Sequence, residues 1–141
     1  MNALQRFKET YSRLKLENLH LLDMIYAEKI HFVDPAHTLN GLDMLKSYFR
    51  ELYRNVGSIE FDFIDQLTEG SRATLEWKMK FTHPRLAKNQ VITVGGCSWI
   101  EFDAEGKAVH HRDYFDLGAM LYEQLPLLGG IVRSIKRRLG Q

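Results

Sequence analysis

The chain has few of the features that mark secreted, membrane-spanning and nucleic-acid-binding proteins. Its single cysteine, Cys97, cannot close an internal disulfide bond, and no apolar run approaches the roughly 20 residues that a membrane-spanning helix needs. The first residues alternate apolar and charged side chains without the apolar core of a signal peptide. A formal net charge of +1 leaves no global electrostatic footprint for nucleic acid. We therefore expect a cytoplasmic protein that does not bind nucleic acid.

Sequence signatures of metal, phosphate and nucleophile chemistry are also missing. The sequence contains no glycine-rich phosphate loop, no GxSxG or HExxH motif and no cysteine pair. Of the six histidines, His110 and His111 are adjacent, so in a strand they point to opposite faces and cannot share one ion. Cys97 lies in a strand-like run and is interpreted as a small buried apolar side chain. We predict neither a bound metal nor a cofactor.

Length and composition predict one globular domain over residues 1–141. A chain of 141 residues that is 45% hydrophobic and 26% charged can bury a substantial core. Residues 126–141 carry four basic residues and no acidic one, and their apolar residues recur at helical spacing. We expect this basic amphipathic segment to pack on its own domain or on a partner subunit. Contact with a membrane surface and contact with nucleic acid are the alternatives.

The N-terminal part of the sequence has helical periodicity. Apolar residues at spacings of three and four predict one helix over residues 3–16 and a second over residues 19–30. Residues 31–35 are typical of an extended segment, because the residue before Pro35 is steered away from the helical region. Asn40 is the predicted N-cap of a third helix, which runs through Leu52 and ends at residues 55–57.

From Ser58 onward the apolar period changes to two, which predicts antiparallel strands. Four strands follow, separated by turns at residues 69–71 and 103–106 and by a longer loop at residues 83–89. Gly95-Gly96 within the third of them predicts a bulge or a sharp bend. Helices followed by strands indicate an α+β fold, with the helices on one face of a curved sheet. The other face carries alternating aromatic residues that need cover, which favours a homodimer.

The stretch from His110 to Leu117 is the strongest functional lead in the sequence. It alternates like a strand and ends where a helix begins, so His111, Asp113 and Phe115 share one face. A buried carboxylate must accept hydrogen bonds or take up a proton. Its burial lowers the stability of the fold but suits the group to acid–base chemistry. Asp116, on the opposite face, is instead the predicted N-cap of the final helix.

Two parts of the sequence resemble a known superfamily. Arg112-Asp113-Tyr114-Phe115-Asp116-Leu117, followed by Leu125-Pro126-Leu127, resembles the end of limonene-1,2-epoxide hydrolase. Phe32-Val33-Asp34-Pro35, followed by Gly41 opening a helix through Tyr48 and Tyr53, resembles the layout of the nuclear-transport-factor-2-like superfamily, which includes SnoaL-like proteins and ketosteroid isomerases. The resemblance implies a cone-shaped antiparallel sheet wrapped on the N-terminal helices (a cystatin-like roll), a dimer, and for Asp113 the role of a base. The same scaffold hosts isomerases, hydrolases, cyclases and non-enzymes.

Around this base the sequence departs from the epoxide hydrolase. The family's arginine and second aspartate fall on Trp77 and Met79, and its water-holding tyrosine and asparagine fall on Phe32 and Asp34. Epoxide opening by that machinery is therefore not expected. What remains is a pair of carboxylates, Asp34 and Asp113, near one apolar pocket.

We predict a pocket for a small apolar molecule, with Asp113, Asp34 and His111 as the candidate catalytic residues. Two carboxylates in an apolar cavity favour a shared proton, and His111 would orient or protonate Asp113. The predicted pocket residues are Phe32, His37, Tyr48, Leu75, Trp77, Met79 and Phe115. The implied enzyme is a cofactor-independent isomerase or hydrolase that works by acid–base catalysis. The alternative is a non-catalytic ligand-binding or protein-interaction module of the same fold.

Each candidate also has a purely structural interpretation. Asp34, before a proline, can cap a turn through its own downstream backbone. Asp113 can be held by Arg112 or Tyr48 as part of the scaffold, and His111 can be a satisfied core histidine.

Overall fold

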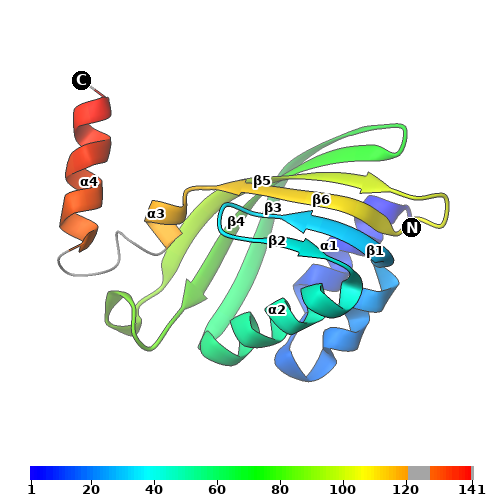
Figure 1. Cartoon of the computed structure of the whole chain (residues 1–141), viewed down its shortest axis with the longest axis horizontal. Coiled ribbons are helices and arrows are strands. Elements are labelled where there is room, and N and C mark those ends of the chain that lie inside the picture. Colours follow the sequence, from blue (N-terminus) through cyan, green and yellow to red (C-terminus); the bar gives the residue numbers. More distant parts are fainter. Residues whose placement is uncertain (121–127, 141) are drawn as a thin grey trace.

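The structure, a computed structural model that describes residues 1–120 and 128–140, is a curved six-stranded sheet with helices α1 and α2 against one face (Figure 1). The strand order is β2-β1-β6-β5-β4-β3, and every neighbouring pair is antiparallel except β1 and β6, which are parallel. The predicted α+β class is confirmed. The core lies between the sheet and the helices that cover it. In chain order the elements are α1 (Ala3–Arg13), η1 (Leu16–Met24), β1 (Tyr26–Val33), β2 (Thr38–Asn40), α2 (Leu42–Asn55), β3 (Ser58–Glu69), β4 (Arg72–Thr82), η2 (Ala87–Asn89), β5 (Ile92–Phe102), β6 (Ala108–Phe115), α3 (Leu117–Met120) and α4 (Leu128–Leu139).

Helix α1 begins at a capping box. The Asn2 side chain accepts a hydrogen bond from the backbone N–H of Gln5 at 2.8 Å, and the Gln5 side chain accepts one from the backbone N–H of Asn2 at 2.9 Å. These two bonds satisfy amide groups that the helix itself leaves unpaired. The helix then buries Leu4, Phe7 and Tyr11, which the spacing of three and four residues places on one face.

The second predicted helix is wrong over its C-terminal half. Residues 16–24 form the 3-10 segment η1, and residues 26–33 form strand β1 instead of continuing a helix. The spacing of four between the buried residues Tyr26 and Ile30 fits both structures, because four is a multiple of two. The parallel pairing with β6 supplies the backbone hydrogen-bond partners and decides for the strand.

Helix α2 is capped by Gly41 rather than by Asn40. Gly41 has φ of 96°, in the left-handed region that glycine adopts without steric cost. Asn40 is the last residue of β2, and its side-chain oxygen lies 2.8 Å from Nδ1 of His31. The cap therefore lies one residue later than predicted, and the helix begins at Leu42.

Strands β3 to β6 confirm the four strands predicted from the period of two. The predicted bulge at Gly95-Gly96 is wrong, because the pairing of β4 with β5 runs without a register shift from Arg72 opposite Glu101 to Phe81 opposite Ile92. Cys97, in the same strand, is only partly buried.

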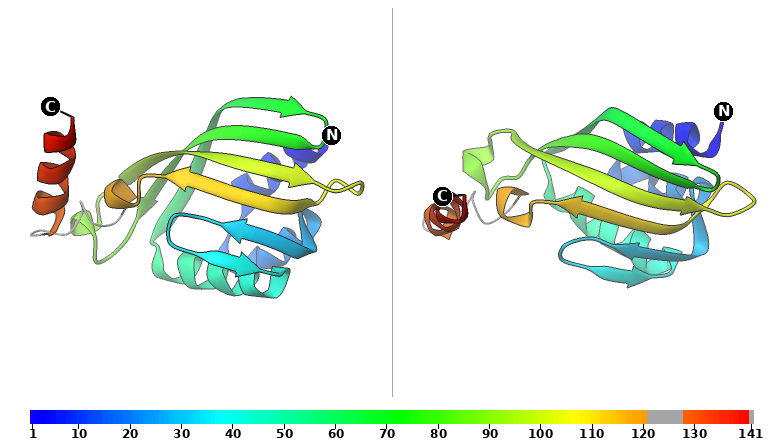
Figure 2. Two further views of the ribbon diagram at one scale, coloured as in Figure 1. Left: turned by 45° about the horizontal axis from the view of Figure 1, so that its top comes forward. Right: turned by 90° about the horizontal axis from the view of Figure 1, so that it is seen from above.

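The C-terminal part begins where β6 ends. The Asp116 carboxylate accepts a hydrogen bond from the backbone N–H of Ala119 at 3.1 Å, which confirms the predicted cap, and it also accepts one from Nζ of Lys136 in α4. Helix α4 lies at this end of the sheet (Figure 2). Leu125-Pro126-Leu127 lies outside the described residues.

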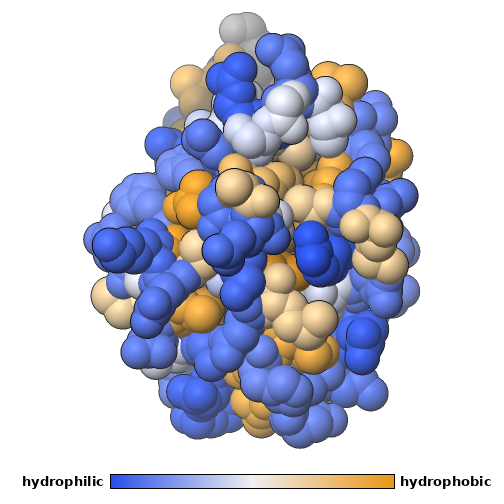
Figure 3. All heavy atoms as spheres, turned by 90° about the vertical axis from the view of Figure 1, so that its right-hand side faces the viewer, coloured by the Kyte–Doolittle hydropathy of each residue, from blue (hydrophilic) through white to orange (hydrophobic). Residues whose placement is uncertain are grey.

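Two further features are the length of the helices and the polarity of the surface. None of the helices described is both long enough and apolar enough to cross a membrane. On the side of the molecule that Figure 3 presents, apolar side chains are visible between hydrophilic ones.

Candidate active site

A cavity lies between the inner face of the sheet and helices α1 and α2. Its volume is about 80 Å³, and it is partly open to solvent; this is small beside the roughly 300–1,000 Å³ of pockets for drug-sized ligands, so it suits a small molecule. Most of its wall is apolar or aromatic, and none of the residues that line it is a lysine or an arginine. The lining residues are Phe7, Tyr11, Phe32, Asp34, Tyr48, Phe49, Leu52, Phe61, Phe63, Leu75, Trp77, Met79, Ser98, His111, Asp113 and Phe115.

The two oxygens of Asp113 are bonded unequally. Oδ1 accepts a hydrogen bond from Oγ of Ser98 at 2.5 Å and lies 2.6 Å from Nε2 of His111. Oδ2 has no hydrogen bond to any residue in the described part of the chain. The side chain is 18% exposed, so it is largely shielded but reachable from the cavity. One oxygen therefore fixes the carboxylate, and the other is left for a ligand.

Ser98 is held in turn by Trp77. Ser98 lies directly opposite Asp113 in the pairing of β5 with β6, and Nε1 of Trp77 donates to Oγ of Ser98 at 2.9 Å. Trp77 can reach this position because its neighbour across β4 and β5 is Gly96. A Cβ atom on Gly96 would stand 2.4 Å from Cη2 of the indole, which is closer than real contacts allow. Gly96 therefore has a packing role beside this ring that the sequence analysis did not predict, and the alternative of a sharp bend at Gly95-Gly96 stays a prediction.

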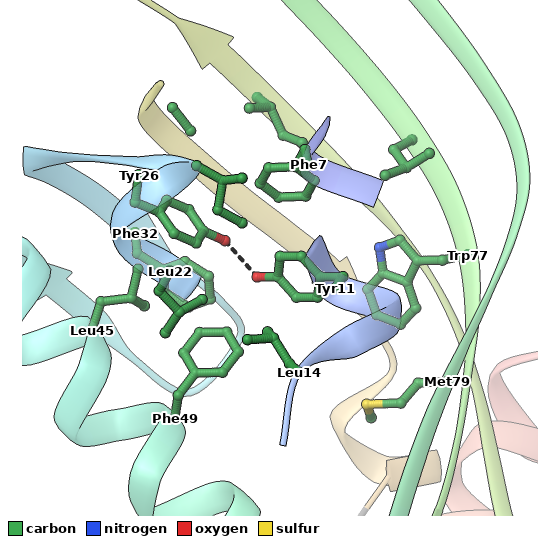
Figure 4. Close-up of a cluster of buried hydrophobic side chains, with 14 of the residues drawn as sticks. Phe7, Tyr11, Leu14, Leu22, Tyr26, Phe32, Leu45, Phe49, Trp77 and Met79 are labelled. Atoms are coloured by element: carbon green, nitrogen blue, oxygen red, sulfur yellow. Dashed lines mark hydrogen bonds between the residues drawn. The ribbon is translucent and has the colours of Figure 1, made fainter. Parts of the chain in front are cut away.

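On its other side, Asp113 is connected to helix α1 through three aromatic residues. The His111 side chain is 2% exposed, and its Nδ1 lies 2.7 Å from the hydroxyl of Tyr26. The Tyr26 hydroxyl is hydrogen-bonded to the hydroxyl of Tyr11. Figure 4 shows Tyr11 between Tyr26 and Trp77, with the dashed line joining the two hydroxyls. The sheet and helix α1 thus share one hydrogen-bonded chain.

The donors in this chain can be assigned from chemistry. An ionised carboxylate only accepts hydrogen bonds, so with Asp113 ionised and the His111 ring carrying one hydrogen, that hydrogen is on Nε2 and Nδ1 accepts from Tyr26. The Tyr26 oxygen then accepts from Tyr11. Burial raises the pKa of both tyrosines well above its ordinary value, so both remain protonated donors. Each hydrogen bond in the chain therefore points toward Asp113.

Asp34 differs from Asp113 because both of its oxygens are occupied. Oδ1 accepts hydrogen bonds from the backbone N–H groups of Ala36 at 2.9 Å and His37 at 2.7 Å, and Oδ2 accepts one from the Tyr48 hydroxyl at 2.9 Å. These bonds match the turn-capping interpretation of the residue before Pro35. The pKa of Tyr48 is raised by burial and by the nearby charge of Asp34. Asp34 lines the cavity as a carboxylate that already has its partners.

Among the predicted site residues, His37 lies outside the cavity wall. Its side chain is 44% exposed, its Nδ1 is 3.1 Å from Oδ1 of Asp34, and its ring packs against Tyr48, which lines the cavity. Neither suggested scaffold partner holds Asp113, because Tyr48 donates to Asp34 and Arg112 stacks on the ring of Tyr114 at 5.1 Å. His111 and Ser98 take that role instead.

Several residues of the wall were not predicted from the sequence. Tyr11 and Ser98, which line the cavity, received no functional interpretation, and neither did Tyr26, which connects Tyr11 to His111. Counting outward from the turn at residues 103–106 would pair Ser98 with His111, and only the register shift between Glu101 and Phe102 places it opposite Asp113. In the described residues, no three histidine, cysteine, aspartate or glutamate side chains gather as a metal site would require.

The fold of the chain is similar to that of several solved structures. The chain is similar to an NTF2-like protein of unknown function from Burkholderia pseudomallei, with 18% identity over 86% of this chain and 95% of that chain and a TM-score of 0.74. It is similar to TsrD from Streptomyces laurentii, with 18% identity over 88% and 95% of the two chains and a TM-score of 0.74. A hypothetical protein with a ketosteroid isomerase-like fold from Catenulispora acidiphila, solved with trimethylamine, has 14% identity over 86% and 90% and a TM-score of 0.73.

These likenesses are too distant in sequence to show more than the fold. Among curated proteins the chain has no match. The predicted nuclear-transport-factor-2-like superfamily is confirmed, whereas the narrower resemblance to limonene-1,2-epoxide hydrolase stays a prediction. Residues 6–111 match the model of the SnoaL-like domain, and the chain belongs to that family.

Proposed function

We propose that this protein binds a small apolar molecule in the cavity and that Asp113 moves a proton on that molecule. The observation that carries the proposal is the unequal bonding of the two Asp113 oxygens. A general base needs a free oxygen and a fixed orientation; the two hydrogen bonds to Oδ1 give the orientation, and Oδ2 of this cavity-lining residue has no hydrogen bond within the described residues. Asp34 is the weaker candidate for the base, since its oxygens are bonded to the turn and to Tyr48.

The reaction class that fits this arrangement is proton transfer next to a carbonyl group. Oδ2 of Asp113 takes a proton from a carbon beside the carbonyl, and the electron pair of the broken C–H bond forms the C=C bond of an enolate. Return of the same proton from Asp113 to another carbon of the conjugated system completes an isomerisation. No water or cofactor is consumed, and atoms and electrons balance.

The lack of a cation in the cavity wall favours this chemistry over epoxide hydrolysis. Opening an epoxide by water needs an acid for the leaving oxygen, and in the resembling hydrolase an arginine connects acid and base. Trp77 and Met79 stand at those positions in this chain and contribute apolar wall. We therefore infer an isomerase rather than an epoxide hydrolase, with a flat apolar substrate held by aromatic rings.

One observation favours the alternative of a binding protein without catalysis. Tyr11 and Tyr48 line the cavity, but their hydroxyl groups already form hydrogen bonds with Tyr26 and Asp34. An enolate oxygen would need one of these donors to turn away from its present partner. If none can, the cavity retains its ligand but does not stabilise the charged intermediate.

The experiment uses NMR to measure the exchange of carbon-bound hydrogen for deuterium in heavy water. The compounds tested are a panel of small cyclic ketones, unsaturated ketones and terpene epoxides. We expect the wild-type protein to catalyse exchange on at least one ketone, and Asp113→Asn to lower the rate by about 10²- to 10⁴-fold, the usual contribution of a general base. Binding of the same ketone, measured by Trp fluorescence, should change little, because asparagine keeps the shape of the side chain.

Ser98→Ala is the matched positioning variant. It removes one of the two bonds that orient Oδ1 and leaves Oδ2 untouched, so kcat should fall less than in Asp113→Asn while KM stays the same. Equal rates for wild type and Asp113→Asn, or no exchange on any ketone, would rule out catalysis by this residue. The binding alternative would then predict an apolar ligand that co-purifies and is visible by native mass spectrometry.

A further inference from the structure

We propose that helix α4 docks on the surface of a membrane that contains anionic phospholipids. Helix α4 exposes an aliphatic stripe made of Ile131, Ile135 and Leu139, whose residues are 50%, 51% and 82% exposed. The three are four residues apart, so they lie on one face of the helix. A stripe of this kind can enter the boundary between lipid headgroups and acyl chains.

The charges of α4 match this partner. On a helix with about 3.6 residues per turn, Lys136 and Arg138 lie on opposite sides of the stripe, whereas Arg133 and Arg137 lie on the face away from it. Residues 126–141 contain no acidic side chain. Arg138 can reach phosphate groups while the stripe enters the lipid, whereas Lys136 is bonded to Asp116.

The stripe is exposed because α4 contacts the rest of the domain through another edge of the helix. Lys136 donates to the Asp116 carboxylate, and Cγ1 of Val132 lies 3.2 Å from where a Cβ atom on Gly118 would stand. These two contacts fix the Val132 and Lys136 edge against α3. Ile131, Ile135 and Leu139 lie outside these two contacts and stay exposed.

A second copy of the chain is a poorer partner for the stripe. Pairing two α4 helices along their stripes would bring the flanking cations of both copies together with no acidic residue in either helix. An anionic lipid surface supplies the opposite charge and the apolar layer at once.

The test is co-sedimentation of the full chain with vesicles of phosphatidylcholine alone and of equal parts phosphatidylcholine and phosphatidylglycerol. We expect binding to the anionic vesicles, weakened by added salt, and little binding to the neutral ones. Ile131→Ser with Ile135→Ser should abolish binding, and Arg137→Glu with Arg138→Glu should weaken it by at least about tenfold. The matched controls are Leu67→Ser, an apolar residue of β3 that is 74% exposed, and Lys88→Glu, and both should bind like wild type.

Three results would overturn the proposal. The first is no sedimentation with either vesicle, or equal sedimentation with both. The second is a dimer, measured by light scattering without lipid, that becomes a monomer in the Ile131→Ser, Ile135→Ser variant. The third is binding of an RNA homopolymer by a protein that ignores the vesicles.

Discussion

Adding one methyl group at Gly96 tests how the candidate site is built. In Gly96→Ala the new Cβ atom would stand 2.4 Å from Cη2 and 2.5 Å from Cζ2 of Trp77, so the buried indole must move. Overpacking of this kind costs about 1–3 kcal/mol. Movement of the indole also breaks the 2.9 Å hydrogen bond to Ser98, which contributes about 1 kcal/mol. We therefore expect the free energy of unfolding to fall by about 2–4 kcal/mol.

Gly95→Ala is the matched control, because a Cβ atom on Gly95 would meet nothing within 4 Å. Replacing glycine by alanine without strain reduces the entropy of the unfolded chain, so this variant should be unchanged or more stable by about 0.5–1 kcal/mol. Urea denaturation followed by circular dichroism measures both variants. In a Trp77→Phe background the colliding ring atoms are gone, and the cost of Gly96→Ala should drop below about 1 kcal/mol. Equal stabilities of the two alanine variants, or the same cost of Gly96→Ala with Phe at position 77, would refute this account of the site.

Two further predictions concern the tyrosines. Tyr26→Phe removes hydrogen bonds to His111 and Tyr11 and should lower the free energy of unfolding by about 1–3 kcal/mol, whereas Tyr53→Phe should cost nothing, because the buried Tyr53 hydroxyl has no partner in the described part of the chain. Denaturation curves that show equal losses would contradict this contrast. Burial raises the pKa of Tyr11 and Tyr26, so the folded chain holds their protons more tightly than the unfolded chain, and the stability that depends on them is complete below pH 10.0 and declines above it. Ultraviolet absorbance should show no phenolate from these two before unfolding, and an earlier signal in wild type that is missing in Tyr11→Phe would argue against their burial.

Local periodicity predicts most of the sheet but not the strand that completes it. Strands β4 and β5 alternate over long runs with one face buried, whereas β3 and β6 alternate over shorter runs and the inner face of β3 is only partly buried. For β1 the buried residues Tyr26 and Ile30 fit a helix equally well, and only the pairing with β6, more than 75 residues away, removes the ambiguity. The helix starts depend on single residues such as Gly41, whose positive φ has no signature in the periodicity.

The candidate site was only partly predictable for a related reason. The alternation that placed His111 and Asp113 on one face is a local property, and the structure has both of them in the cavity wall. The partners Ser98, Trp77 and Tyr26 come from three other strands, so their hydrogen bonds depend on strand register and on the parallel pairing of β1 with β6. The homodimer and the cytoplasmic location stay predictions.

The hydrogen bond between Tyr26 and His111 joins residues 85 positions apart in the chain. A ribosome adds about 5–20 residues each second, so about 4–17 seconds separate the synthesis of the two partners. During that interval the Tyr26 hydroxyl has no imidazole to bind, and the edge of β1 that β6 will cover stays open. The candidate site therefore forms only after β6 has been made, and a nascent chain released before β6 would have helices α1 and α2 without the site.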